Sequence, residues 1–125
     1  MSLLLLGLFF TVFAGASWQI DVLDDVQVAF EQGNVKTLQK FFDADVVITL
    51  NGSQNHYSEK QAQQVLQNFL STNKPDSFKI SNQGWSAHGD VYMIGEYYSN
   101  NTKHLIYLYF KKAGSSYTLQ ELRID

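Results

Sequence analysis

The chain has 125 residues, 45% of them apolar, with nine Lys and Arg against twelve Asp and Glu and no cysteine. This length fits a single domain. A net charge of -3 without a cluster of Lys and Arg argues against electrostatic capture of nucleic acid or of an anionic membrane surface. The absence of cysteine excludes disulfides, thiolate chemistry and Cys-ligated zinc.

The apolar residues are concentrated at the amino terminus. Leu3 to Phe13 form an almost unbroken apolar run, which has the length of a signal-peptide core and is shorter than the ~20 residues that span a bilayer. Ala14-Gly15-Ala16 then gives the small-x-small pattern that signal peptidase accepts. We therefore expect a signal peptide over residues 1–16, a mature domain over residues 17–125 and no stable membrane span after cleavage.

The expected destination is the bacterial periplasm or the cell exterior, because a small eukaryotic secreted domain usually carries disulfides. One element of a signal peptide is missing, since no Lys or Arg precedes the apolar run. Two explanations stay open, a positive region made by the amino terminus alone or a true start further upstream. The alternative to cleavage is an uncleaved interfacial anchor.

Three helices are expected next along the chain. Apolar residues at helical spacing predict the first, which ends at Gly33: Ile20, Leu23, Val26 and Phe30. A short second helix is expected from its cap at Asn34 through Phe42. The third starts at the capping-box spacing of Ser58 and Gln61 and continues to about Thr72.

Five strands complete the predicted order of helix, helix, strand, helix and four strands. They are rich in β-branched and aromatic residues and are bounded by turn residues. Their expected ranges are Val46–Leu50, Phe78–Gln83, Val91–Ser99, Leu105–Lys112 and Tyr117–Ile124.

A two-residue loop at Asn100-Asn101 fixes the pairing of the strands on either side of it. Ser99 then opposes Thr102, and opposed residues project to the same face of the sheet. One face is apolar and should be covered by the helices: Val91, Met93 and Gly95 opposite Phe110, Leu108 and Ile106. The other face carries Tyr92 opposite Tyr109, Ile94 opposite Tyr107, and Glu96 opposite Leu105.

The order of elements resembles the cone-shaped, cystatin-like α+β fold of the nuclear transport factor 2-like superfamily, in which helices close the concave side of a curved, mainly antiparallel sheet. Four local strings resemble a family of small exported bacterial proteins of unknown function within that superfamily: Ala29-Phe30-Glu31-Gln32-Gly33-Asn34, Tyr57-Ser58-Glu59-Lys60-Gln61-Ala62, Tyr92-Met93-Ile94-Gly95 and Glu121-Leu122-Arg123-Ile124. The resemblance implies fold and export, but no reaction.

The candidate ligand-binding site lies at one end of the helix-covered face. Tyr97 opposes His104 there, and a short hairpin at Ala113-Gly114 would place Arg123 beside His104 and Glu121 beside Ile106. In enzymes with this fold, an Asp or His acts as acid or base and a Tyr donates to a developing oxyanion, roles that His104 and Tyr97 would take here. A bulge in the last strand would instead turn Glu121 and Arg123 outward and bury Leu122 and Ile124.

No cofactor or metal is expected from the sequence. His56, His88 and His104 lack the short-range spacing of a metal site. There is also no Gly-x-Ser-x-Gly elbow and no glycine-rich phosphate loop.

Two functional hypotheses follow. The first is an exported, non-enzymatic module that binds a small apolar or aromatic ligand or a protein partner, and that forms homodimers through Tyr92, Ile94, Tyr107 and Tyr109 on the outer face. The second is an isomerase-like or dehydratase-like enzyme that acts on a small hydrophobic substrate with His104 and Tyr97. Strand propensity alone is the alternative explanation of the outer tyrosines.

Overall fold

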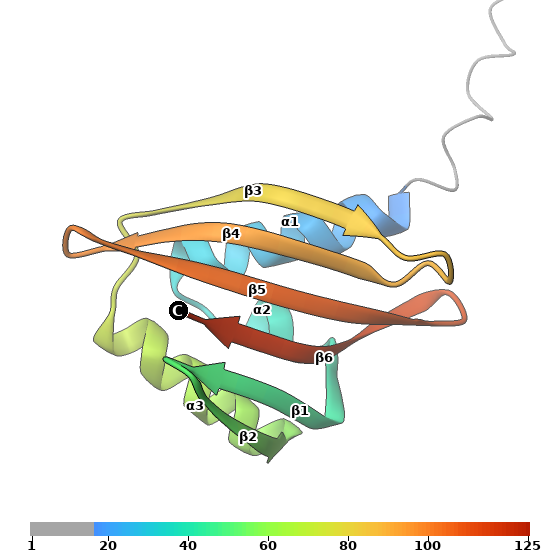
Figure 1. The fold of residues 1–125 in the computed structure, drawn as a ribbon, viewed down its shortest axis with the longest axis horizontal. Helices are drawn as coiled ribbons and strands as arrows, with labels where there is room; N and C mark the ends of the chain where they lie inside the picture. Colours follow the sequence, from blue (N-terminus) through green and yellow to red (C-terminus); the bar gives the residue numbers. More distant parts are fainter. Residues whose placement is uncertain (1–16) are drawn as a thin grey trace, which may run out of the picture.

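The computed structural model describes residues 17–125, which form three helices and one six-stranded sheet (Figure 1). The helices are α1 (Ser17–Gln32), α2 (Lys36–Gln39) and α3 (Glu59–Thr72). The strands are β1 (Phe42–Leu50), β2 (Ser53–Ser58), β3 (Ser77–Trp85), β4 (Val91–Ser99), β5 (Thr102–Ala113) and β6 (Ser116–Ile124). The predicted signal peptide over residues 1–16 lies outside the described residues.

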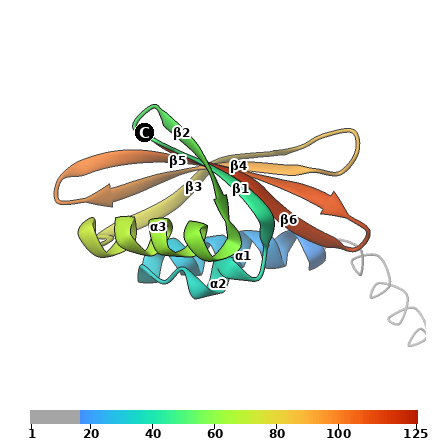
Figure 2. The ribbon, with the colours of Figure 1, turned by 90° about the horizontal axis from the view of Figure 1, so that it is seen from below.

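The sheet has the strand order β2-β1-β6-β5-β4-β3, and only β1 and β6 pair in parallel among these neighbours. All three helices lie on one side of the sheet (Figure 2). The predicted fold class is therefore confirmed: an α+β domain with three helices packed on a curved, mainly antiparallel sheet.

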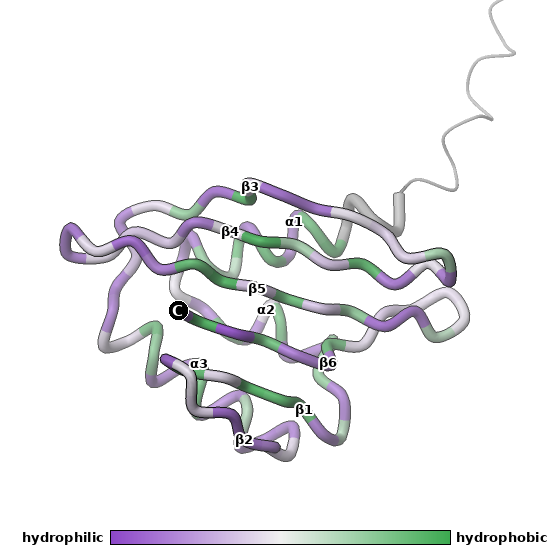
Figure 3. The backbone as a smooth tube through the Cα atoms, viewed as in Figure 1, coloured by the Kyte–Doolittle hydropathy of each residue, from purple (hydrophilic) through white to green (hydrophobic). Residues whose placement is uncertain are grey.

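Strand β2 was not expected from the sequence. Its residues are polar, as the tube coloured by hydropathy shows, and five of the six are exposed (Figure 3). Asn51 and Gly52 both have positive φ, 49° and 86°, as the two-residue turn of a tight hairpin requires. The turn therefore folds a polar segment back onto β1, although that segment has no strand-like hydrophobic pattern.

The second helix is shorter than predicted. The expectation that it continues to Phe42 is wrong, because α2 ends at Gln39 and Phe42 is the first residue of β1. Phe42 pairs with Leu119 of β6, and the Leu119 N–H donates to the Phe41 carbonyl over 2.6 Å. Pairing with a strand distant in sequence thus outweighs the local helical pattern.

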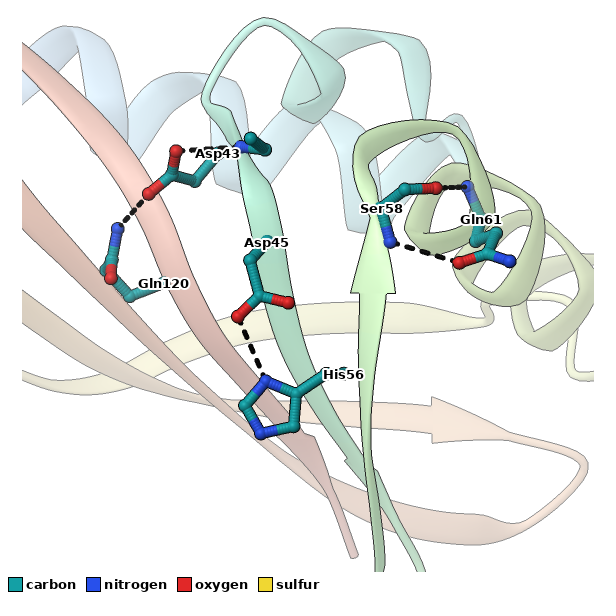
Figure 4. A network of polar contacts seen from close by, with 7 residues as sticks. Asp43, Asp45, His56, Ser58, Gln61 and Gln120 are labelled. Carbon is teal, nitrogen blue, oxygen red and sulfur yellow. Dashed lines mark hydrogen bonds and ion pairs between the residues drawn. The ribbon is translucent and has the colours of Figure 1, made fainter.

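The predicted cap of the second helix at Asn34 is wrong, because the N-cap is Val35, although the Asn34 side chain accepts from the Lys36 N–H over 2.9 Å. Two other predicted helix boundaries are confirmed. Gly33 ends α1 with a φ of 65°. At the start of α3, the Ser58 hydroxyl accepts from the Gln61 N–H (3.2 Å) and the Gln61 side chain accepts from the Ser58 N–H (3.1 Å), which completes the capping box (Figure 4).

The predicted register of β4 and β5 is confirmed at every pair from Val91↔Phe110 to Ser99↔Thr102. The face that these strands turn to the helices forms the core. Its central residues are at most 1% exposed: Val91, Met93, Ile106, Leu108 and Phe110. Alternation of apolar and polar residues therefore sets the register, because a slip by one residue would expose this row.

A bulge in β6 decides which of its residues are buried. Tyr109 pairs with Glu121 while Phe110 pairs with Leu119, so Gln120 is the extra residue. Beyond the bulge, Leu122 and Ile124 turn inward and are 0% and 1% exposed. Gln120 also donates to the Asp43 carboxylate over 2.6 Å, which ties the bulge to β1 (Figure 4).

Two glycines let aromatic rings lie flat against the sheet, one on each face. A Cβ at Gly95 would lie 2.3 Å from the ring of Phe78 on the inner face, and a Cβ at Gly84 would lie 2.4 Å from the ring of Tyr92 on the outer face. The Phe78 ring is confined, since it packs 5.0 Å from the Phe30 ring and is 5% exposed.

We predict that Gly95→Ala destabilises the domain by about 1–3 kcal/mol, because the confined Phe78 ring must leave its position. Urea unfolding measures the change, with Gly84→Ala as the matched control. The control should cost clearly less, since the half-buried ring of Tyr92 can swing into solvent. Equal costs for the two variants would contradict this description of the core.

Candidate functional site

The four residues predicted to form an inner site do not come together. Tyr97 pairs with His104 as expected, but Arg123 pairs with Tyr107 and Glu121 pairs with Tyr109. The prediction that Arg123 lies beside His104 and Glu121 beside Ile106 is therefore wrong. There are two physical reasons. The turn lies at Gly114-Ser115 and not at the predicted Ala113-Gly114, and the bulge turns Glu121 and Arg123 outward so that β6 buries its two apolar residues instead.

Tyr97 is a core residue with a satisfied hydroxyl group. Its side chain is 0% exposed and packs against the rings of Phe30 and Phe69, and its hydroxyl donates to the Asn73 carbonyl. Burial, together with the charge of Asp76, raises the pKa of Tyr97 to about 12. The phenol thus stays protonated at neutral pH and holds the end of α3 against the sheet.

His104 is half-buried and packs edge-on against Phe69, with the two ring centroids 5.4 Å apart. Between the helices and the sheet, buried apolar side chains of the described residues form one core cluster. Two hollows lie at the margins of the described domain. One of about 360 Å³ lies between the β1–β2 hairpin and α3, and one of about 270 Å³ lies beside Phe41.

The outer face of the sheet carries the tyrosines that the sequence assigned to it. We call Tyr92, Ile94, Leu105, Tyr107 and Tyr109 the tyrosine face. Leu105 is 44% exposed and the other four are half-buried by their neighbours in the sheet. No helix of the described chain lies on this side (Figure 2).

Polar contacts hold several of these side chains in place. The Tyr109 hydroxyl donates to Asp90 over 2.6 Å, and Asp90 also accepts from the Lys112 N–H over 2.9 Å. Both hydrogen bonds lower the pKa of Asp90, and the one from Tyr109 has the larger effect. The lowered pKa favours the charged form of Asp90. The Arg123 guanidinium lies over the Tyr107 ring at 5.0 Å from its centroid.

Asp90 is the residue of this surface that the sequence did not predict. Glu121 and Arg123 were expected in the interior, and the stated alternative, a bulge that turns them outward, is the one that the structure shows. Burial and the charge of Glu121 raise the pKa of Tyr107, while Arg123 acts in the opposite direction. The charged pair thus belongs to the margin of the tyrosine face.

A second polar cluster lies at the β1–β2 end of the sheet. His56 contacts Asp45 over 2.9 Å, and both side chains are more than 60% exposed (Figure 4). Among residues 17–125, no three His, Cys, Asp or Glu side chains are grouped as a metal site requires. Within the same range, no helix has the length and apolar content needed to cross a membrane.

The family of the chain follows from comparison with known proteins. The model of a domain of unknown function, DUF4783, matches residues 23–125. The chain belongs to the DUF4783 family. A search of curated proteins gives no match.

Solved structures agree with this assignment. A DUF4783 protein from Bacteroides uniformis is 26% identical, with a TM-score of 0.77 over 83% of this chain and 95% of its own. One from Bacteroides fragilis is 25% identical, with a TM-score of 0.75 over 81% and 94%. An NTF2-like protein of unknown function from Shewanella baltica shares the fold at 8% identity, with a TM-score of 0.67 over 92% and 95%. The chain thus has the fold of nuclear transport factor 2-like proteins, as its sequence predicted.

We predict that Tyr97→Phe lowers the free energy of unfolding by about 1 kcal/mol, because the Asn73 carbonyl loses its buried donor. The effect has a definite pH dependence. A phenol whose pKa rises from 10.0 to about 12 on folding stabilises the fold fully below pH 10, and this contribution is lost as the pH rises towards 12.

Urea unfolding at pH 8 and at pH 11 measures both effects. Tyr57→Phe is the matched control, since the half-buried Tyr57 hydroxyl has no hydrogen-bond partner in the part of the chain that the structure describes. A Tyr97→Phe variant as stable as the wild type at both values of pH would contradict the structural role of this hydroxyl.

Proposed function

We propose that the chain is an exported, non-enzymatic binding domain that pairs with a second copy of itself through the tyrosine face. The observation that carries this proposal is the continuous row of aromatic and aliphatic side chains on β4 and β5, on the side of the sheet opposite all three helices. Tyrosine suits such a surface because it buries a large apolar ring and keeps a polar tip.

The charges around the tyrosine face favour a second copy over a strongly charged partner. Both signs occur in equal number among the outward residues of β3 to β6 and their turns. The positive residues are Lys79, Lys103, Lys111 and Arg123, and the negative ones are Asp90, Glu96, Glu121 and Asp125. A surface of mixed charge can meet its own copy without net repulsion and can form ion pairs at its margin.

The size of the face suits a dimer of modest affinity. Four strands about 4.8 Å apart and nine residues at about 3.3 Å each give a flat area of roughly 570 Å² for β3 to β6. Standard interfaces bury about 800 Å² of accessible surface per partner. Accessible surface follows the contours of the side chains and is therefore larger than the flat area of the same face.

The acid–base enzyme has less support, because its four residues are not assembled. Glu121 and Arg123 face outward, and the Tyr97 hydroxyl is engaged by the Asn73 carbonyl. Within residues 17–125, the rings packed against His104 are those of Phe69 and of the engaged Tyr97, and neither supplies a second group for proton transfer.

We predict that Tyr107→Lys with Tyr109→Lys converts a dimer into a monomer, because two ammonium groups would be buried at the centre of the pairing surface. Sedimentation equilibrium over a range of concentrations measures the mass. Gln64→Lys with Ser71→Lys is the matched control, since it adds the same charge to exposed positions of α3. The control should keep the dimer mass. A monomer mass for the wild type and both variants would refute the proposal.

Export is the second part of the proposal and is supported by the apolar run Leu3 to Phe13 followed by Ala14-Gly15-Ala16. We predict that expression in a bacterium yields a periplasmic or secreted product that begins at Ser17, and that Ala16→Trp blocks this cleavage. Cell fractionation with intact mass determination tests this. An uncleaved product of the wild-type sequence in the membrane fraction would favour the interfacial anchor.

A further inference from the structure

The two edges of the sheet differ in how they are protected. At the β3 edge, Ser81 forms a bulge, Lys79 is exposed, and the Gln27 side chain of α1 donates to the Phe78 carbonyl over 2.8 Å. Bulges, lysines and covering groups are the devices that keep edge strands from pairing with other chains. The β2 edge has a regular register from Ser53 to Ser58, with neither a bulge nor a Lys.

The hairpin geometry fixes which groups of β2 point away from the sheet. A two-residue turn makes Leu50 and Ser53 a hydrogen-bonded pair, so Ser53, Asn55 and Tyr57 bond to β1. The N–H and C=O groups of Gln54 and His56 then face outward. The Ser58 N–H confirms this alternation, because it bonds to the Gln61 side chain and not to β1.

These outward backbone groups of Gln54 and His56 have no hydrogen-bond partner within residues 17–125. Both residues are exposed. The edge therefore offers two donors and two acceptors at the spacing of a β-ladder, which an added strand would satisfy.

A hollow of about 360 Å³ lies between the β1–β2 hairpin and α3, and Tyr57 of β2 forms part of its wall. Its walls contain no charged residue. They are formed by Leu50, Tyr57, Val65, Asn68, Phe69, Thr72 and Asn73. The apolar members of this set are half-buried, so they can still take up a side chain.

We propose that β2 and this hollow form a binding site for an extended, uncharged segment of a partner protein with apolar side chains at alternate positions. The segment adds a seventh strand beside β2 through Gln54 and His56, and its inward side chains enter the hollow. Strand addition of this kind takes affinity from the main chain and specificity from pockets for alternate side chains. A second copy of β2 fits less well, because it offers only Tyr57 as an apolar inward residue.

The probe for this site is a labelled, capped seven-residue peptide of alternating Leu and Thr, with backbone N-methyl groups on one edge so that it pairs along the other only. Fluorescence anisotropy measures binding, and amide resonances locate it. We expect shifts at Gln54 and His56 and no binding of a control peptide that is N-methylated on both edges. A probe with Glu in place of Leu should also fail to bind.

Gln54→Pro removes one outward N–H and leaves the β1–β2 ladder intact, since Gln54 is not a hydrogen-bonded partner of β1. Affinity for the Leu-Thr probe should fall about tenfold or more, whereas Gln54→Thr should bind like the wild type. Asn68→Arg, at an exposed position in the wall of the hollow, is a second variant that fills the site without touching the strand, and it should also abolish binding.

Three results would overturn the proposal: equal binding of both peptides, undiminished binding to Gln54→Pro and Asn68→Arg, or shifts confined to the tyrosine face. A loss of dimer mass in Gln54→Pro without peptide would assign the edge to a second copy instead. The tyrosine face is tested separately through Tyr107 and Tyr109, so either proposal can fail without the other.

Discussion

The bulge at Gln120 is the constraint on which the two faces of this sheet depend. It lets the last strand bury Leu122 and Ile124 and turns Glu121 and Arg123 to the outside, next to Tyr109 and Tyr107. Inserting or deleting one residue before Gln120 would turn Glu121 and Arg123 inward and Leu122 and Ile124 outward. The hydrophobic gain from two buried aliphatic side chains, about 2–3 kcal/mol each, is large beside the cost of one interrupted pair.

The bulge also separates Glu121 and Arg123 from the other two residues of the expected inner site. Without the outward rotation of β6, Arg123 and Glu121 would lie in the interior opposite Ile106 and Leu108, on the face where an acid–base site was expected. With it, the interior is closed by Tyr97 and its bond to the Asn73 carbonyl, and the charges surround the tyrosines. The two surfaces proposed for binding accordingly lie on the outer face of the sheet and at its β2 edge.

Much of this architecture could be predicted from the sequence. The register of β4 and β5 follows from the Asn100-Asn101 loop and strict alternation, and the capping box marks the start of α3. Strand β2 could not be predicted, because its own residues are polar and have no strand-like pattern. It forms because the preceding turn brings it beside β1. The sequence allowed the bulge in β6 as an alternative but could not decide for it. Both registers of β6 agree with the local sequence pattern, and only packing against the helices decides between them.

The absence of cysteine from the chain allows a direct test of pairing through the tyrosine face. Leu105→Cys places one thiol on the tyrosine face, and Gln64→Cys places one on exposed α3. The rate of maleimide labelling is measured at increasing protein concentration. If the tyrosine face pairs with a second copy, labelling at Leu105→Cys slows as dimers form while labelling at Gln64→Cys is unchanged. Rates that are independent of concentration at both positions would contradict this pairing.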